Sequence, residues 1–226
     1  MNPRRTGALS MEALLAIRTR VFDELLQTRA LRQVMAGTVD RAGYIRYLLN
    51  VFHYAQYSPV VMAIAASRCL PTHPELASYL LRHAREETGH DVWAAQDLRD
   101  LGVGEEELHA SRPVSSCAAL IGYTHYVAGF ANPIGIFGWM YVLEAVGLDV
   151  GNLVAEKLRS AGAQGIRFIA GHAVADTDHI REITEQLESH LQRDEDRAAV
   201  LEVADVVADL YLGMFREIGE ERARWD

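Results

Sequence analysis

The sequence predicts a single all-α domain in which seven helices pack as a bundle. Apolar residues recur at three- and four-residue spacing along almost the whole chain, as on helices that bury one face, and no stretch alternates like a β-strand. The connecting segments are short, and no change in composition marks a linker within the 226 residues. We therefore expect residues 1–10 to form a tail and residues 11–226 to form one helical domain with a substantial core.

The first half of the chain predicts three of these helices. Helix one is expected over residues 11 to about 27 after the capping residue Ser10, and a short helical turn over 31–35 should end at Gly37. Helix two is expected from about residue 38 to 68 with a kink at Pro59, and helix three from residue 74 to 102.

The second half predicts four more helices. An acidic loop and a short connector separate helix three from helix four, which is expected over residues 114–130. Helix five begins at Asn132-Pro133, reaches Leu148 and could extend to Ser160. Helices six and seven are expected over about 165–191 and 194–222, which completes one helical domain.

Composition excludes several classes of partner. The net charge is -9 and no Lys/Arg-rich run is present, so we expect no binding to nucleic acid. Cys69 and Cys117 form no CxxC pair and fit a reducing compartment, so a cytoplasmic location is expected. The longest apolar tract, residues 113–148, contains His125, Asn132-Pro133 and Glu144. It therefore predicts buried helices and no membrane span.

Two of the expected helices carry ligand-type residues in line with their apolar face. On helix three, His83, Glu87 and His90 are spaced i, i+4 and i+7, and these positions share one face of an α-helix. Helix six repeats the pattern His-x3-(Glu/Asp)-x2-His with three more residues: His172, Asp176 and His179. One such match is weak evidence, but two on separate helices indicate a common site.

Glu144 strengthens this interpretation. It is the single ionisable carboxylate of residues 133–148, and no Lys or Arg lies within ten residues on either side. A buried carboxylate of this kind costs at least a few kcal/mol unless it finds a cation or a proton. A metal ion is the simplest partner. On helix two, His53 lies on the internal face and is a further candidate.

The donor types indicate which metal to expect. Carboxylates and imidazoles without thiolates suit iron or manganese better than a structural zinc site. Di-iron bundles place Glu and Glu-x-x-His ligands on facing helices in this way, and Glu87-Thr-Gly-His90 is such a step. Iron held with open coordination positions activates dioxygen, so an oxidase or oxygenase is the expected reaction class.

The chain resembles the haem-oxygenase-like di-metal oxidases and oxygenases, which are iron-containing redox enzymes. They share a fold with the TenA thiaminases and pyrroloquinoline quinone synthase. The resemblance covers nearly the whole chain and is carried by YIRYLLNVFHY at 44–54, HAREETGHD at 83–91, Glu144, and HAVADTDH at 172–179. It implies a haem-oxygenase-like bundle, two metal ions (iron, or iron and manganese), dioxygen and a small organic substrate such as an amino acid, amine or fatty acid. It also suggests a homodimer. The ligands it implies are Glu87, His90, Glu144, His172, Asp176 and His179.

Several alternatives stay open. Glu86 competes with Glu87 as the ligand of helix three, and His53 and His83 occupy places where some members of the family have a carboxylate. For His53 and for His83 three roles stay open: metal ligand, substrate contact or histidine of the core. A metal-free enzyme of the same fold and a non-catalytic ligand-binding protein are the competing functions. No arginine lies clearly on the internal faces to mark a carboxylate-bearing substrate, and Arg46, one turn before Leu49, is the candidate that stays open.

Overall fold

The fold was analysed in a computed structural model, which describes residues 11–219 and, within that range, all side chains except those of 173–177. The described residues form helices joined by short turns, and no β-strand occurs among them. The predicted all-α class is therefore confirmed. Ser10, the expected first cap, lies outside the described residues.

The helices follow one another along the chain with few intervening residues. In order they are α1 (Met11–Gln27), α2 (Arg29–Met35), α3 (Arg41–Ala55), α4 (Ser58–Cys69), α5 (Pro74–Glu87), α6 (His90–Asp100), α7 (Glu105–Ala110), α8 (Ser115–Phe130), the 3-10 helix η1 (Pro133–Gly135), α9 (Ile136–Val146), the π-helix η2 (Gly147–Gly151), α10 (Asn152–Ser160), α11 (Arg167–His190) and α12 (Asp194–Gly219).

Two of the seven expected helices are broken, which corrects the prediction. The second is divided into α3 and α4 by a turn at Gln56–Tyr57. Pro59 is in the first turn of α4, where a missing N–H costs no hydrogen bond, so it marks a helix start and not a kink. The third is divided into α5 and α6 at Thr88–Gly89, where Gly89 adopts a left-handed conformation with φ of 96°. A side chain at this φ would be strained, so glycine suits the break.

The remaining helices agree with the prediction apart from small changes. The segment expected as an acidic loop contains the short helix α7 of six residues. The fifth helix does continue to Ser160, but through the π-helical segment η2. A π-helical turn holds one more residue than an α-helical turn, and such turns are often found at functional sites.

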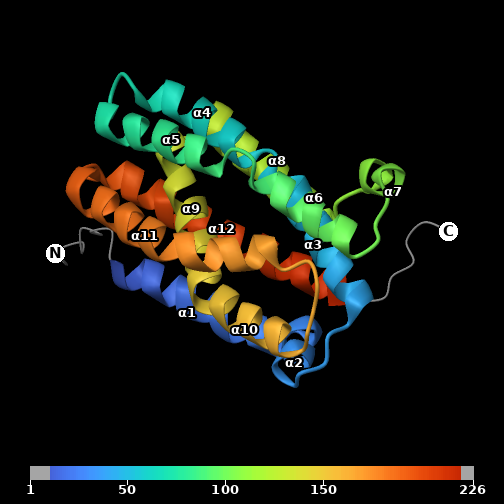
Figure 1. Cartoon of the computed structure of the whole chain (residues 1–226). Coiled ribbons are helices and arrows are strands. Elements are labelled where there is room, and N and C mark those ends of the chain that lie inside the picture. The colour runs from blue at the N-terminus through green and yellow to red at the C-terminus, as the bar shows by residue number, and fades with distance from the viewer. Residues whose placement is uncertain (1–10, 220–226) are drawn as a thin grey trace.

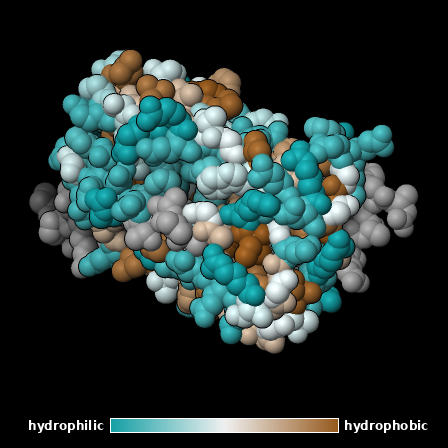
Figure 2. All heavy atoms as spheres, viewed as in Figure 1, coloured by the Kyte–Doolittle hydropathy of each residue, from teal (hydrophilic) through white to brown (hydrophobic). Residues whose placement is uncertain are grey.

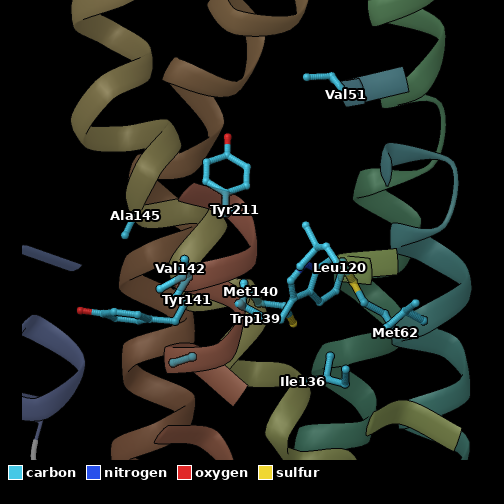
Figure 3. Packing of buried hydrophobic residues seen from close by; sticks show 14 of the residues in the cluster. Val51, Met62, Leu120, Ile136, Trp139, Met140, Tyr141, Val142, Ala145 and Tyr211 are labelled. Atoms are coloured by element: carbon cyan, nitrogen blue, oxygen red, sulfur yellow. The ribbon is translucent and has the colours of Figure 1, made fainter. Parts of the chain in front are cut away.

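Helix α9 is at the centre of the molecule. Figure 1 shows α3 to α6 and α8 in one group, α1, α2 and α10 in another, and α9, α11 and α12 between them. In Figure 3, Trp139 and Met140 point toward Met62 and Leu120, whereas Tyr141 points to the opposite side of the helix. At Gly138 a Cβ atom would lie 2.1 Å from the backbone oxygen of Val200, so the close approach of α9 and α12 requires glycine at this position.

Burial explains why this part of the chain is so apolar. Among the described residues, Pro133–Ser160 is long and apolar enough to cross a membrane, but 67% of its most apolar window is buried inside the molecule. A core helix passes the same test of length and composition. The visible face of the protein is largely hydrophilic, with hydrophobic residues in scattered patches (Figure 2).

Candidate metal centre

Four helices of the core bring ligand-type side chains to one place. Glu87 is the last residue of α5 and His90 the first residue of α6, so the two flank the break at Thr88–Gly89 and belong to the same group of ligand-type residues. Glu144 comes from α9, and His172 and His179 are two turns apart on α11. Side chains far apart in the sequence therefore converge in the interior.

The first group consists of His83, Glu87, Glu144 and His179. One ligand atom from each lies within 4.8 Å of the others. Nε2 of His83 is 3.1 Å from Oε1 of Glu144, and Nδ1 of His179 is 3.2 Å from Oε2 of the same carboxylate. Glu144 thus lies between two imidazoles, and the two rings are 4.4 Å apart.

The second group consists of Glu87, His90 and His172, again with ligand atoms within 4.8 Å of one another. Nδ1 of His90 is 3.1 Å from Oε2 of Glu87, and the rings of His90 and His172 are 4.6 Å apart. Glu87 belongs to both groups. Among the described residues, Glu87 is therefore the carboxylate that the two groups share.

The pKa of each of the two buried carboxylates is below the ordinary value for glutamate, which favours the ionised form. Burial by itself would raise the pKa of Glu144, but hydrogen bonds from His179 and His83 outweigh it and bring the pKa below its ordinary value. Burial likewise opposes ionisation of Glu87, whose pKa is nevertheless lowered by the adjacent imidazoles of His90 and His172. Two negative charges with imidazoles around them form a site that favours cations.

These residues fit a metal. Oε1 of Glu87 is buried and has no hydrogen-bond partner among the described residues, although buried polar atoms normally have one. The donors are carboxylate oxygens and imidazole nitrogens, the ligands expected for iron or manganese. A cation at this position would occupy the unused acceptor of Glu87.

The structure also distinguishes Glu87 from Glu86 as the candidate ligand of this part of the chain. The side chain of Glu86 is 34% exposed and pairs with Arg82 at 3.4 Å. Its Oε2 lies 3.7 Å from Nδ1 of His83 and 3.8 Å from Nε2 of His179, so it is at the rim of the first group. Glu87 is the residue that lies inside both groups.

The structure places the other candidate ligands, His83, His53 and Asp176, in different ways. His83, which the sequence left open, is buried within the first group. His53 is outside both groups, and its Nε2 forms a 2.9 Å hydrogen bond with Oγ of Ser111. The side chain of Asp176 lies outside the described residues. Metal binding by the converging residues stays a prediction.

Aromatic side chains around the imidazoles were missed by the sequence analysis. The ring of Trp93 stacks on His90 at 4.2 Å, Phe168 lies 4.4 Å from His172, and Tyr79 stacks on His83 at 5.7 Å. Phe168 and Tyr79 each precede their histidine by one helical turn. That spacing was the available signal, but it is equally typical of core packing.

A cavity of about 150 Å³ adjoins the centre. Glu87, Glu144 and His172 line its inner end, and most of the remaining wall is apolar. Neither cysteine is among the lining residues that the structure describes. Cys117 is buried, and burial raises the pKa of its thiol to about 12, which does not favour a nucleophilic cysteine.

Comparison with known families agrees with this donor set. A family described as iron-containing redox enzymes matches residues 45–212, a range that holds both groups. The chain belongs to this family. A search of curated proteins found no significant match.

The solved structures with similar folds support the expected haem-oxygenase-like architecture. A domain of unknown function with a heme oxygenase-like fold from Shewanella denitrificans has a TM-score of 0.84 and 22% identity, and covers 92% of this chain and 91% of its own. A TenA homologue from Pseudomonas syringae has a TM-score of 0.71 and 18% sequence identity, and the match covers 95% of this chain and 98% of the homologue. A TenA homologue from Pyrococcus furiosus has a TM-score of 0.74 and 14% sequence identity, and the match covers 94% of this chain and 100% of the homologue. At these identities the similarity shows the fold alone, so the function of this member of the iron-containing redox enzyme family has to be argued from its site.

Proposed function

We propose that the protein is a dioxygen-dependent oxidase or oxygenase with two metal ions, either two irons or one iron and one manganese. His83, Glu87, Glu144 and His179 would hold one ion, and Glu87, His90 and His172 the other. The observation that carries the proposal is the position of Glu87 in both groups, with a buried oxygen that has no hydrogen-bond partner among the described residues.

The chemistry of the bound metal would be the binding and reduction of dioxygen, which iron supports when coordination positions stay open. The protein residues supply the conditions for it. Glu87 and Glu144 offset the charge of the cations, and the aromatic rings of Trp93 and Phe168 fix the imidazoles of the second group. The apolar cavity admits a small organic substrate to the inner end and keeps bulk water from it.

Anaerobic iron loading of the purified protein tests the proposal. We expect up to two iron ions per chain by elemental analysis, one for each group, and oxygen consumption when an accepted substrate is present. The Glu144→Gln variant should lose the ion of the first group, because it removes the carboxylate between His83 and His179. Wild-type protein that binds neither iron nor manganese would rule the proposal out.

A second candidate is a metal-free acid–base enzyme of the same fold. Its support is that Glu144 already accepts hydrogen bonds from His83 and His179, as in a catalytic carboxylate–imidazole arrangement. Elemental analysis of protein from iron-supplemented cells separates the two candidates. Activity that persists after complete removal of metal by a chelator would favour this second function.

A further inference from the structure

One partly exposed carboxylate, that of Glu86, lies at the rim of the first group. Its Oε2 is 3.7 Å from Nδ1 of His83 and 3.8 Å from Nε2 of His179. The two imidazoles face Glu144 with their other nitrogens, Nε2 of His83 and Nδ1 of His179. Each ring therefore has one nitrogen toward the buried carboxylate and one toward the rim.

The nitrogens at the rim are spaced for a cation and not for hydrogen bonds. Separations of 3.7 and 3.8 Å are too long for a hydrogen bond from an imidazole to Glu86. Two ligands of one metal ion, with bonds of about 2.1 Å, lie roughly 3–4 Å apart. Nδ1 of His83 is buried and has no hydrogen-bond partner among the described residues. A cation between Glu86 and His83 would supply the partner that a buried polar atom requires.

The apolar cavity is a less favourable route for a hydrated cation. Glu144 lines its inner end, but neither His83 nor His179 is among its lining residues. Most of the wall is apolar, so an ion that crossed it would lose water without gaining ligands. At the rim, the ion meets the carboxylate of Glu86 while it is still partly hydrated. The path through the rim therefore costs less desolvation.

Arg82 competes for the carboxylate of Glu86. Its guanidinium is 3.4 Å from Oε1 of Glu86 and 2.6 Å from Oε2 of Glu182 on α11. It also lies over the ring of Tyr79, 5.0 Å from the centroid. The side chain of Arg82 is 43% exposed, so water weakens its pair with Glu86. Arg82 thus restrains Glu86 at the rim and leaves it open to solvent.

We propose that Glu86 is the loading ligand of the first group: it binds a divalent cation at the surface and passes it, by way of His83 and His179, to Glu144. Arg82 slows this step, because it holds Glu86 and places a positive charge beside the path. The inference rests on the part of the proposed function that assigns a metal to the first group, and it is independent of the reaction with dioxygen. It gives Glu86 a role in the rate of metal entry and none in the amount of metal held.

Manganese uptake by the metal-free protein tests the proposal, with loss of the EPR signal of free Mn²⁺ after rapid mixing as the readout. The phase that belongs to the first group is the one that Glu144→Gln removes. We expect Glu86→Gln to slow this phase roughly tenfold, because one charged partner is lost from the path. Release into excess EDTA should slow by the same factor, since entry and release share one route. The final metal content should equal that of the wild type.

Two further variants separate ligation from a general effect of charge. Arg82→Gln should speed uptake roughly twofold to fivefold, which corresponds to the free energy of an exposed ion pair. Glu185→Gln is the matched control and should leave uptake unchanged. Glu185 is exposed on α11, pairs with Arg181 at 2.9 Å and belongs to neither group of ligand-type residues.

Failure of this inference is distinguishable from failure of the proposed function. If Glu86→Gln takes up and releases Mn²⁺ at the wild-type rates, the inference is overturned and the proposed function stands. The inference is also overturned if the variant releases Mn²⁺ faster and holds less of it, since Glu86 would then be a permanent ligand. Slower uptake by Arg82→Gln would overturn it as well, because the competition requires the opposite sign. Wild-type protein that takes up no metal would overturn both.

Discussion

At the scale of single residues, the shared position of Glu87 is the feature with the largest expected effect. Its carboxylate lies in both groups, whereas that of its neighbour Glu86 is one-third exposed at the rim. We expect Glu87→Gln to lower the iron content at both groups, because a neutral amide cannot offset the charge of two cations. Glu86→Gln should change the iron content little. Iron per chain, measured after equal loading of both variants, checks the prediction, and equal losses in the two would contradict it.

Gly171 controls the aromatic wall of the second group. A Cβ atom at this position would lie 2.7 Å from Cζ3 of Trp93, whose ring stacks on His90. We expect Gly171→Ala to displace the indole ring and to weaken metal binding at the second group by roughly tenfold, the usual effect of disturbing the residues that orient ligands. Metal titration together with tryptophan fluorescence measures both changes.

Gly129→Ala is the matched control for this substitution. A Cβ atom at Gly129 has no neighbour within 4 Å, so the metal affinity should stay unchanged. If both variants bind metal as the wild type does, Trp93 does not position the imidazoles.

At the scale of helices, the break between α5 and α6 sets the spacing of two candidate ligand residues, Glu87 and His90. Gly89 has a φ of 96° and a Cβ atom there would meet no other atom within 4 Å, so the cost of Gly89→Ala is backbone strain alone. We expect it to lower the free energy of unfolding by about 1–2 kcal/mol. Gly89→Asn should cost less, because asparagine tolerates this conformation. Urea unfolding of the two variants checks the order, and a Gly89→Ala protein as stable as the wild type would contradict it.

The order of the helices and the convergence of the site follow from the sequence, but the breaks do not. The spacing of His83, Glu87 and His90 fits one face of a continuous helix, so periodicity could not reveal the turn at Gly89. A proline such as Pro59 looks the same in the sequence whether it kinks one helix or lies in the first turn of another. Only the tertiary structure shows that a new helix begins beside it. Glu144 was predictable because a lone charge in an apolar helix demands a partner.

At the scale of the whole molecule, Asp196 joins three helical segments far from the metal centre. It is buried at the start of α12, accepts hydrogen bonds from Asn132 at 2.8 Å and Arg193 at 2.6 Å, and lies 3.3 Å from His73. Burial would raise its pKa, but the hydrogen bonds from Arg193 and Asn132 lower it below the ordinary value of 3.8. The folded protein therefore binds a proton at Asp196 more weakly than the unfolded chain does.

This difference predicts how stability changes with pH. A depressed pKa adds stability that is fully present above about 3.8 and is lost as the pH falls through the lower value of the folded state. Asp196→Asn should lower the Tm at neutral pH, and the gap to the wild type should shrink in acid. Asp194→Asn, at a side chain that is 68% exposed, is the control and should show little change. Thermal unfolding of the metal-free proteins across this pH range checks the prediction, and a gap that widens in acid would contradict it.

The burial of α9 against α12 has a consequence for biosynthesis. The ribosome completes the most apolar helix of the protein well before it reaches α12, the helix whose backbone covers Gly138. Until α12 has been synthesised, the face of α9 that packs against it stays uncovered, as is common for segments that wait for a later partner. Chaperones that bind exposed hydrophobic chains should therefore associate with nascent chains that end before residue 194 and release those that extend through α12.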